Sequence, residues 1–210
     1  MKYTHILWDW NGTLLDDVEI SIDCVNIMLE KLGLQKTNLS EYYQMMDFPM
    51  HRYYENLFNK RGSQLEYKLC TKNFQENYPK LIDNASLSDG TTQILSYIKN
   101  QGAKQYIVSS FEKTKLCQYV EKFNVKNYFE IISGDDSINV ESKSQRAIDI
   151  VKNVDKSKIL YIGDTKADYI TACDIGCDCV LYSGGHQPRE VLEKFNQPVI
   201  DNLTQLKEYI

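Results

Sequence analysis

Short runs of consecutive apolar residues recur along the chain, each followed by a polar stretch. The first run, Tyr3–Trp8, ends in the polar turn Asp9–Thr13. Similar runs cover residues 105–108, 158–162 and 179–182, and a weaker one covers residues 129–132. Unbroken apolar runs, as opposed to alternating ones, are typical of strands covered on both faces of a parallel sheet. The pattern therefore predicts five buried parallel strands.

Helical periodicity fills the gaps between these strands. Apolar residues recur at spacings of three and four in residues 93–100, 113–123, 143–153 and 167–175. Gly176 follows the last of these segments and is a natural helix stop. Strands that alternate with helices form right-handed β-α-β units, so we expect an α/β fold with a doubly wound parallel sheet.

One stretch interrupts this alternation. Residues 16–88 show successive helical patterns and no convincing strand, and Asp16 or Asp17 can cap the first of these helices. We therefore predict two domains: an α/β core of residues 1–15 plus 89–210, and an inserted all-α cap domain of residues 16–88.

Composition and charge narrow the class of protein. The chain has 210 residues, and 24 Lys and Arg against 29 Asp and Glu give a formal net charge of −5. Nucleic-acid and anionic-membrane binders need a basic face, so neither kind of partner is expected. No apolar run is long enough to span a membrane and no export signal is evident, so we expect a cytoplasmic protein.

Three of the six cysteines lie close together in sequence, as Cys173, Cys177 and Cys179. Their spacing is not a standard zinc pattern. Buried, reduced thiols are the favoured interpretation, and a metal site is the alternative.

Polar side chains follow the predicted strands. Asp9 and Asn11 follow the first strand, Ser109 and Ser110 the second, and Asp164 and Asp168 the fourth, while Lys143 begins the helix after the third. Ligands of an open parallel sheet bind beyond the carboxyl ends of its strands. Carboxylates suit Mg²⁺, and a lysine with hydroxyl groups suits a phosphoryl group. These positions therefore predict a site for a hard divalent cation, which Mg²⁺ fits, and for a phosphoryl group.

At these residues the sequence resembles the haloacid dehalogenase superfamily, on its phosphoglycolate-phosphatase-like branch with a helical cap. Four motifs occur in the family's order: Asp9-Trp10-Asn11-Gly12-Thr13, Ser109, Lys143, and Gly163-Asp164-Thr165-Lys166-Ala167-Asp168. The resemblance covers the whole chain. It implies a Rossmann-like core and a Mg²⁺-dependent phosphatase that forms an aspartyl phosphate.

The resemblance also implies a role for each motif residue. Asp9 is the expected nucleophile. The expected Mg²⁺ ligands are Asp9, the backbone carbonyl of Asn11 and Asp164. Asp168 either binds the ion through water or orients the neighbouring side chains. Ser109 and Lys143 are expected to bind the phosphoryl group. Ser110 is either a further phosphate ligand or a helix N-cap.

Asn11 departs from the family's pattern, because phosphatases of the superfamily have a second Asp there that acts as general acid and base. Three outcomes follow. The first, which we favour, is a slow phosphatase. The second is a hydrolase whose substrate has a leaving group that needs no acid, such as the C–P substrates of other superfamily hydrolases. The third is a protein that binds phosphate in a regulatory role with little or no turnover.

The predicted cap offers two candidate substrate contacts. His51 and Arg52 follow the break at Phe48-Pro49 and are expected at a helix start, where a cationic side chain can meet an anionic substrate. A solvated helix face is the alternative. In the core, His186 lies in a glycine loop after the last strand and is a further candidate. The sequence names neither the substrate nor the oligomeric state.

Overall fold

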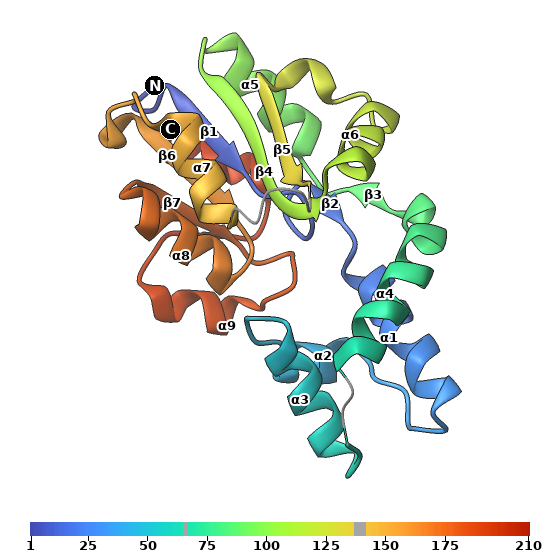
Figure 1. Cartoon of the computed structure of the whole chain (residues 1–210). Coiled ribbons are helices and arrows are strands. Elements are labelled where there is room, and N and C mark those ends of the chain that lie inside the picture. The colour runs from blue at the N-terminus through green and yellow to red at the C-terminus, as the bar shows by residue number, and fades with distance from the viewer. Residues whose placement is uncertain (65–66, 137–141) are drawn as a thin grey trace. The chain divides into compact units, whose positions relative to one another are not determined.

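A computed structural model of the protein describes residues 1–64, 67–136 and 142–210 (Figure 1). Its contacts divide the chain into two compact units. The first, here called the α/β unit, comprises Met1–Leu15 and Leu87–Ile210; the second, the helical unit, comprises Asp16–Ser86. That the helical unit acts as a cap over the site stays a prediction.

The α/β unit is built on one parallel sheet of six strands in the order β5-β4-β1-β6-β7-β8. The strands are β1 His5–Trp8, β4 Lys104–Glu112, β5 Ile131–Asp135, β6 Ile159–Gly163, β7 Asp178–Tyr182 and β8 Val199–Ile200. The five predicted strands and the α/β class are confirmed. The sixth strand, β8, has two residues, which is too short to produce a recognisable apolar run.

Helices connect these strands, and most lie where the periodicity predicts them. They are α5 Thr91–Asn100, α6 Lys113–Lys122, α7 Lys143–Val151, α8 Lys166–Ile175 and α9 Arg189–Leu192, with 3₁₀ turns at Lys126–Tyr128, Lys156–Lys158, Glu193–Phe195 and Leu203–Glu208. Gly176 ends α8 in the left-handed conformation, as its position in the sequence predicts.

Successive side chains of each strand point to opposite faces of the sheet and pack in two apolar layers, one on each face. Leu7, Val108 and Tyr161 belong to one buried cluster, which also contains Ala147 and Val151 of α7. Residues of the opposite parity are equally buried on the other face, where the Gln105 amide accepts from the indole of Trp8 and donates to the Leu95 carbonyl of α5. Helices thus cover both faces of the sheet, which explains why its strands are apolar without interruption.

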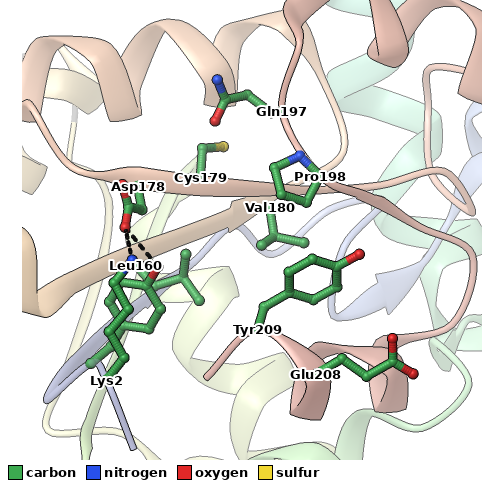
Figure 2. Close-up of a pocket in the computed structure, with 10 residues that line it drawn as sticks. Lys2, Leu160, Asp178, Cys179, Val180, Gln197, Pro198, Glu208 and Tyr209 are labelled. Carbon is green, nitrogen blue, oxygen red and sulfur yellow. Dashed lines mark hydrogen bonds and ion pairs between the residues drawn. The ribbon is translucent and has the colours of Figure 1, made fainter.

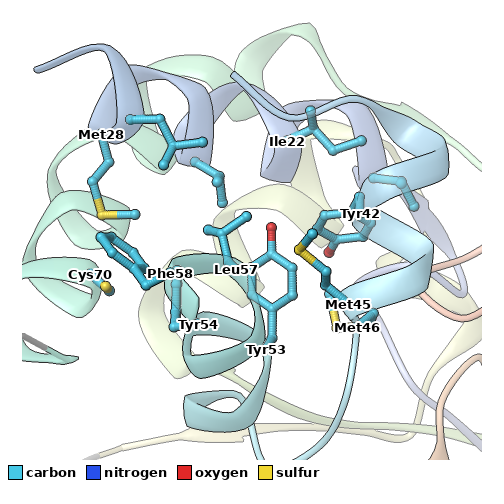
Figure 3. Packing of buried hydrophobic residues seen from close by; sticks show 13 residues of the cluster. Ile22, Met28, Tyr42, Met45, Met46, Tyr53, Tyr54, Leu57, Phe58 and Cys70 are labelled. Carbon is cyan, nitrogen blue, oxygen red and sulfur yellow. The ribbon is translucent and has the colours of Figure 1, made fainter. Parts of the chain in front are cut away.

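The helical unit contains α1 Val18–Lys31, α2 Leu39–Met45, α3 His51–Lys60, α4 Tyr67–Leu81 and a 3₁₀ turn at Ile82–Asn84. Its core is rich in tyrosine and methionine (Figure 3). Tyr42, Tyr53 and Tyr54 are at most 5% exposed and stack edge-on or tilted against one another. These tyrosines therefore serve to pack the unit.

Two details at the ends of the helical unit correct the sequence analysis. Asp17 occupies the N-cap position of α1 but makes no side-chain cap; its carboxylate instead accepts a hydrogen bond from the Tyr78 hydroxyl of α4. Strands β2 Leu15–Asp16 and β3 Ser86–Leu87 pair with each other at the two ends of the predicted strand-free stretch. Two-residue strands leave no periodic signal, so the sequence did not predict them.

Glu41 of α2 links two helices of this unit. Its carboxylate accepts from Lys60 at 2.9 Å and from Arg61, whose side chain is 7% exposed, at 2.8 Å. Although partial burial raises its pKa, the hydrogen bonds from Lys60, Thr37 and Arg61 outweigh that effect and lower the pKa from 4.5 to about 2. The ionised carboxylate therefore stabilises the folded unit.

Glu41→Gln is expected to lower the free energy of unfolding at pH 7 by about 1–2 kcal/mol, because it leaves Arg61 without its carboxylate. The stabilisation by Glu41 is fully present above the unfolded pKa near 4.5 and is lost as the pH falls toward about 2. The difference between variant and wild type should therefore narrow below pH 4.5. Urea unfolding across this pH range measures it. Glu76→Gln, which removes an exposed pair with Lys72, is the control and should change little; a constant difference at all pH values would contradict the prediction.

Candidate functional site

Asp9 lies at the carboxyl end of the central strand β1. Its backbone N–H donates to the Ile162 carbonyl of β6 at 2.9 Å, which extends the strand pairing to this residue. The chain then turns sharply, because the N–H groups of Thr13, Leu14 and Leu15 all donate to the Trp10 carbonyl. The carboxylate of Asp9 is thereby held at the strand end on a tight loop.

The turn after Asp9 requires glycine. Gly12 has a φ of +71°, and a Cβ at this position would lie 2.2 Å from the Asp164 Oδ2. The close approach lets the Thr13 hydroxyl donate to Asp164 Oδ1 at 2.8 Å, while the backbone N–H of His186 donates to Oδ2 at 2.7 Å. Asp164, which follows β6, is thus fixed from both sides.

Asp168 lies in the first turn of α8 and is fully buried. Its Oδ2 accepts from the backbone N–H of Thr165 at 3.0 Å, which is one half of a capping box with that residue, and also from the Thr165 hydroxyl at 2.7 Å. Its Oδ1 accepts from Lys143 at 2.6 Å and from the Tyr161 hydroxyl at 3.3 Å. Of the two roles expected for Asp168, these contacts favour orienting its neighbours.

Lys143 begins α7, as predicted, and connects two of the carboxylates. Its Nζ lies 2.8 Å from Asp9 Oδ1 and 2.6 Å from Asp168 Oδ1. Burial alone would lower the pKa of Lys143, but the charges of Asp168 and Asp9 raise it well above its ordinary value, so the side chain is a fixed cation.

Asp9, Asp164 and Asp168 offer carboxylate oxygens that all lie within 4.8 Å of one another. Among the described residues, no other group of three His, Cys, Asp or Glu side chains is close enough to hold a metal ion. Burial, and then the charge of Asp168, raises the pKa of Asp9, and burial likewise raises the pKa of Asp164. One lysine does not balance three buried carboxylates, so the cluster favours a further cation.

Ser109 and Ser110 of β4 have different surroundings. Ser109 is 1% exposed and its Oγ accepts from the Phe111 N–H at 3.0 Å, whereas Ser110 is exposed. The N-cap interpretation of Ser110 is wrong, because Glu112 caps α6 by accepting from the N–H groups of Thr114 and Lys115. In the register of the sheet Trp8 pairs with Ile107, which places Ser109 and Asp9 at the same edge.

The remaining candidates divide between the two units. Asn11 follows Asp9 in the turn and forms an isolated bridge with Leu15, and His186 lies beside Gly12, whose Cβ would be 2.6 Å from the imidazole Cδ2. His51 begins α3 in the helical unit, where its ring packs against Tyr67, and Arg52 lies 3.6 Å from Asp47. A contact of His51 or Arg52 with substrate stays a prediction.

Several residues of the site were not predicted as functional. Thr165 has a sequence signal, since a threonine three residues before Asp168 forms a capping box. Tyr161, which donates to Asp168, and Arg146, which donates to the Ser109 carbonyl at 2.7 Å, have no such signal. Their contacts depend on how α7 and α8 pack against β4 and β6.

The cysteines and the membrane prediction can also be compared with the structure. All six cysteines are free; Cys179 is buried and Cys177 partly buried, but Cys173 is exposed, so the prediction of three buried thiols is wrong for that residue. Burial raises the pKa of the Cys177 thiol to about 12. In the part of the chain that the structure describes, no helix is long and apolar enough to cross a membrane.

A separate pocket of about 390 Å³ lies near the amino ends of β6 and β7 (Figure 2). Asp178 at its rim accepts from Lys2 and from the Tyr3 hydroxyl, both at 2.6 Å. Leu160 and Val180 form part of its wall. The pocket is therefore at the opposite end of the strands from Asp9 and Asp164 and is not part of the site.

Comparison with known sequences gives a consistent result. Residues 6–182 match the family model described as haloacid dehalogenase-like hydrolase. A phosphoglycolate phosphatase of Pseudomonas fluorescens is 24% identical over 210 residues, which cover 96% of this chain and 77% of that protein. A phosphoglycolate phosphatase of Neisseria gonorrhoeae is 24% identical over 200 residues, or 90% of this chain and 84% of the relative.

Solved structures share the fold. A predicted phosphatase from Clostridium acetobutylicum superposes with a TM-score of 0.80 at 20% identity, over all of this chain and 98% of its own. At this level of identity the superposition establishes the common architecture.

Proposed function

The chain belongs to the haloacid dehalogenase-like hydrolases, and from this premise we propose that it is a Mg²⁺-dependent phosphatase that hydrolyses a small phosphorylated metabolite through an aspartyl phosphate on Asp9. The observation that carries the proposal is the cluster of Asp9, Asp164 and Asp168 around Lys143 at the carboxyl ends of β1 and β6. The similarity to phosphoglycolate phosphatases adds support for a small phosphorylated substrate.

The donor set fits Mg²⁺, since hard oxygen ligands converge where negative charge is in excess. Asp9, Asp164 and the backbone carbonyl of Asn11 would hold the ion. Asp168 would instead orient its neighbours, because its Oδ1 is ion-paired with Lys143 and its Oδ2 accepts from Thr165, whereas the groups that donate to Asp164 are uncharged. When bound, Mg²⁺ supplies positive charge that offsets the charge of the carboxylates and of the phosphoryl oxygens.

The protein's own groups define the reaction. An oxygen of Asp9 attacks phosphorus, and the bond from phosphorus to the leaving oxygen breaks, so that this oxygen departs with the electron pair. Lys143 and the Ser109 hydroxyl hold the transferred phosphoryl oxygens. Water then attacks phosphorus and gives a proton to solvent water, and the bond from phosphorus to the Asp9 oxygen breaks, which releases inorganic phosphate and restores the Asp9 carboxylate.

Asn11 favours a second candidate function. Its amide can neither protonate the leaving oxygen nor take a proton from water, which is the task of a general acid and base. The chain would then bind phosphate with little or no turnover, or act on a substrate with a stable leaving group. Release of phosphate from a panel of phosphorylated metabolites, with Mg²⁺ and with chelator, separates these functions.

Two further parts of the proposal concern the setting of the enzyme. The helical unit would select the substrate, with His51 and Arg52 as candidate contacts. We propose the cytoplasm as the location; the free thiols of all six cysteines are consistent with a reducing compartment. The expected absence of nucleic-acid and membrane partners stays a prediction.

Mg²⁺ should stabilise the wild-type protein against heat. Binding to the folded state adds about 2.7 kcal/mol to the free energy of unfolding when free Mg²⁺ is about a hundred times its Kd. Asp164→Asn should remove most of this response, because it deletes one carboxylate of the cluster. Differential scanning calorimetry with and without Mg²⁺ measures the shift in Tm.

Asp178→Asn is the control, since Asp178 is the first residue of β7, at the opposite end of the sheet, and pairs with Lys2. It should keep the full response to Mg²⁺. An equal Mg²⁺-induced shift in wild type and in Asp164→Asn would argue that the ion binds elsewhere.

A further inference from the structure

Strand β4 carries a bulge where it reaches the site. Val108 pairs with Ser133 and Glu112 pairs with Asp135, so a step of four residues in β4 opposes a step of two in β5. Ser109, Ser110 and Phe111 of β4 thus lie opposite Gly134 alone, so two residues are extra. Bulges of this kind redirect side chains and are common beside active sites.

The bulge packs closely on strand β5. A Cβ on Gly134 would lie 2.6 Å from the Lys113 Cα and 2.8 Å from the Phe111 carbonyl oxygen. Both contacts are with backbone atoms, which cannot move aside as the end of a flexible side chain can, so a larger residue would clash at this position. The absence of a side chain at Gly134 therefore allows β5 to pack closely against the bulge.

Two contacts hold Ser109 in this irregular segment. Its Oγ accepts from the Phe111 N–H at 3.0 Å, which leaves the hydroxyl hydrogen for another acceptor. Its backbone carbonyl accepts from Arg146 Nη2 at 2.7 Å. Since Ser109 is 1% exposed, water cannot readily replace the guanidinium at this carbonyl.

Arg146 is well placed to link the two phosphate-binding groups. It lies three residues after Lys143 on α7, hence on the same side of the helix. The helix is anchored in the core by Ala147 and Val151, both fully buried. A planar, permanently charged guanidinium on an anchored helix gives a short hydrogen bond of fixed direction.

We propose that Arg146 is a positioning residue for phosphoryl binding: it holds the bulged Ser109 by its carbonyl and thereby fixes the Ser109 hydroxyl relative to Lys143. The inference rests on the proposed function only for the identity of the bound group. The positioning of Ser109 is a property of the fold and can be measured without turnover.

The test compares Arg146→Gln and Arg146→Lys with Arg189→Gln. Arg189 is a matched control, because its Nη2 also donates to a strand carbonyl, at a distance of 3.1 Å. The acceptor is Val199 of β8, which lies at the far edge of the same sheet. The probe is inorganic phosphate in the presence of Mg²⁺, with Kd measured by titration calorimetry. We expect Arg146→Gln to raise this Kd about tenfold, Arg146→Lys to raise it less, and Arg189→Gln to leave it unchanged.

A second readout separates this inference from the proposed function. Amide hydrogen exchange at Phe111, whose N–H bonds to Ser109 Oγ, should quicken in Arg146→Gln and not in Arg189→Gln. If wild type binds no phosphate, the proposed function fails, and exchange at Phe111 alone decides whether Arg146 positions Ser109. Unchanged exchange at Phe111, or wild-type phosphate affinity in Arg146→Gln, would overturn the inference.

Discussion

Asp9→Asn is expected to lower kcat for phosphate-ester hydrolysis by about 10⁴-fold or more. The amide keeps the shape of the side chain but lacks the charged oxygen that would attack phosphorus. Folding should survive, because the substitution removes one of three crowded buried carboxylates and thereby relieves their repulsion. The measurement is phosphate release from an aryl phosphate at saturating Mg²⁺.

Two observations accompany this experiment. Wild type quenched in acid during turnover should carry phosphate on Asp9, which mass spectrometry of a proteolytic digest detects, and Asp9→Asn should carry none. Asp178→Asn serves again as a carboxylate-to-amide control and should keep wild-type kcat. An Asp9→Asn protein with more than a tenth of wild-type activity would show that another group is the nucleophile.

Asn11→Asp is expected to raise kcat for alkyl phosphates by about 10²-fold, because it introduces a carboxyl group where a general acid and base is missing. Alkyl phosphates leave as alkoxides of high pKa and need a proton. Aryl and acyl phosphates leave as stable anions, so their rates should rise less. The measurement is kcat of both proteins across leaving groups of graded pKa.

Asn127→Asp provides the control, since Asn127 is exposed in the same unit and gains the same charge in the 3₁₀ turn that precedes β5, toward the amino ends of the strands. A wild type whose rate is independent of leaving-group pKa, together with no gain in Asn11→Asp, would mean that another residue supplies the proton. His186, beside Gly12, and His51 would be the next positions to replace.

The sequence predicted the strands of the sheet because each long strand is buried on both faces and therefore continuously apolar. It did not predict β8, β2 or β3, each of two residues, because their existence depends on pairing with a neighbour. The same reason explains the error at Ser110. A serine before a helix resembles an N-cap, but the bulge carries β4 as far as Glu112, which takes that role.

The members of the site could be predicted because parallel strands bring their carboxyl ends to one edge of a sheet. Their mutual contacts could not. Lys143 contacts both Asp9 and Asp168, and Arg146 contacts Ser109. Both sets of contacts depend on the position of α7 along the direction of the strands. No local sequence pattern predicts that position of α7, since it results from the packing of Ala147 and Val151 in the core.

The pairing of β2 with β3 has an evolutionary consequence. The chain leaves the α/β unit and returns to it at neighbouring backbone positions, and the Ser88 N–H donates to the Leu14 carbonyl at 3.0 Å just inside the junction. The two ends of the insert are held together by this pairing. The length of the insert then has little effect on the stability of the α/β unit, because each doubling of a loop's length adds only about 0.6 kcal/mol to the entropic cost of closing it. The helical unit can therefore be lengthened, shortened or exchanged for a different insert while the sheet keeps its register, so that under the proposed function substrate choice and reaction chemistry are free to diverge separately.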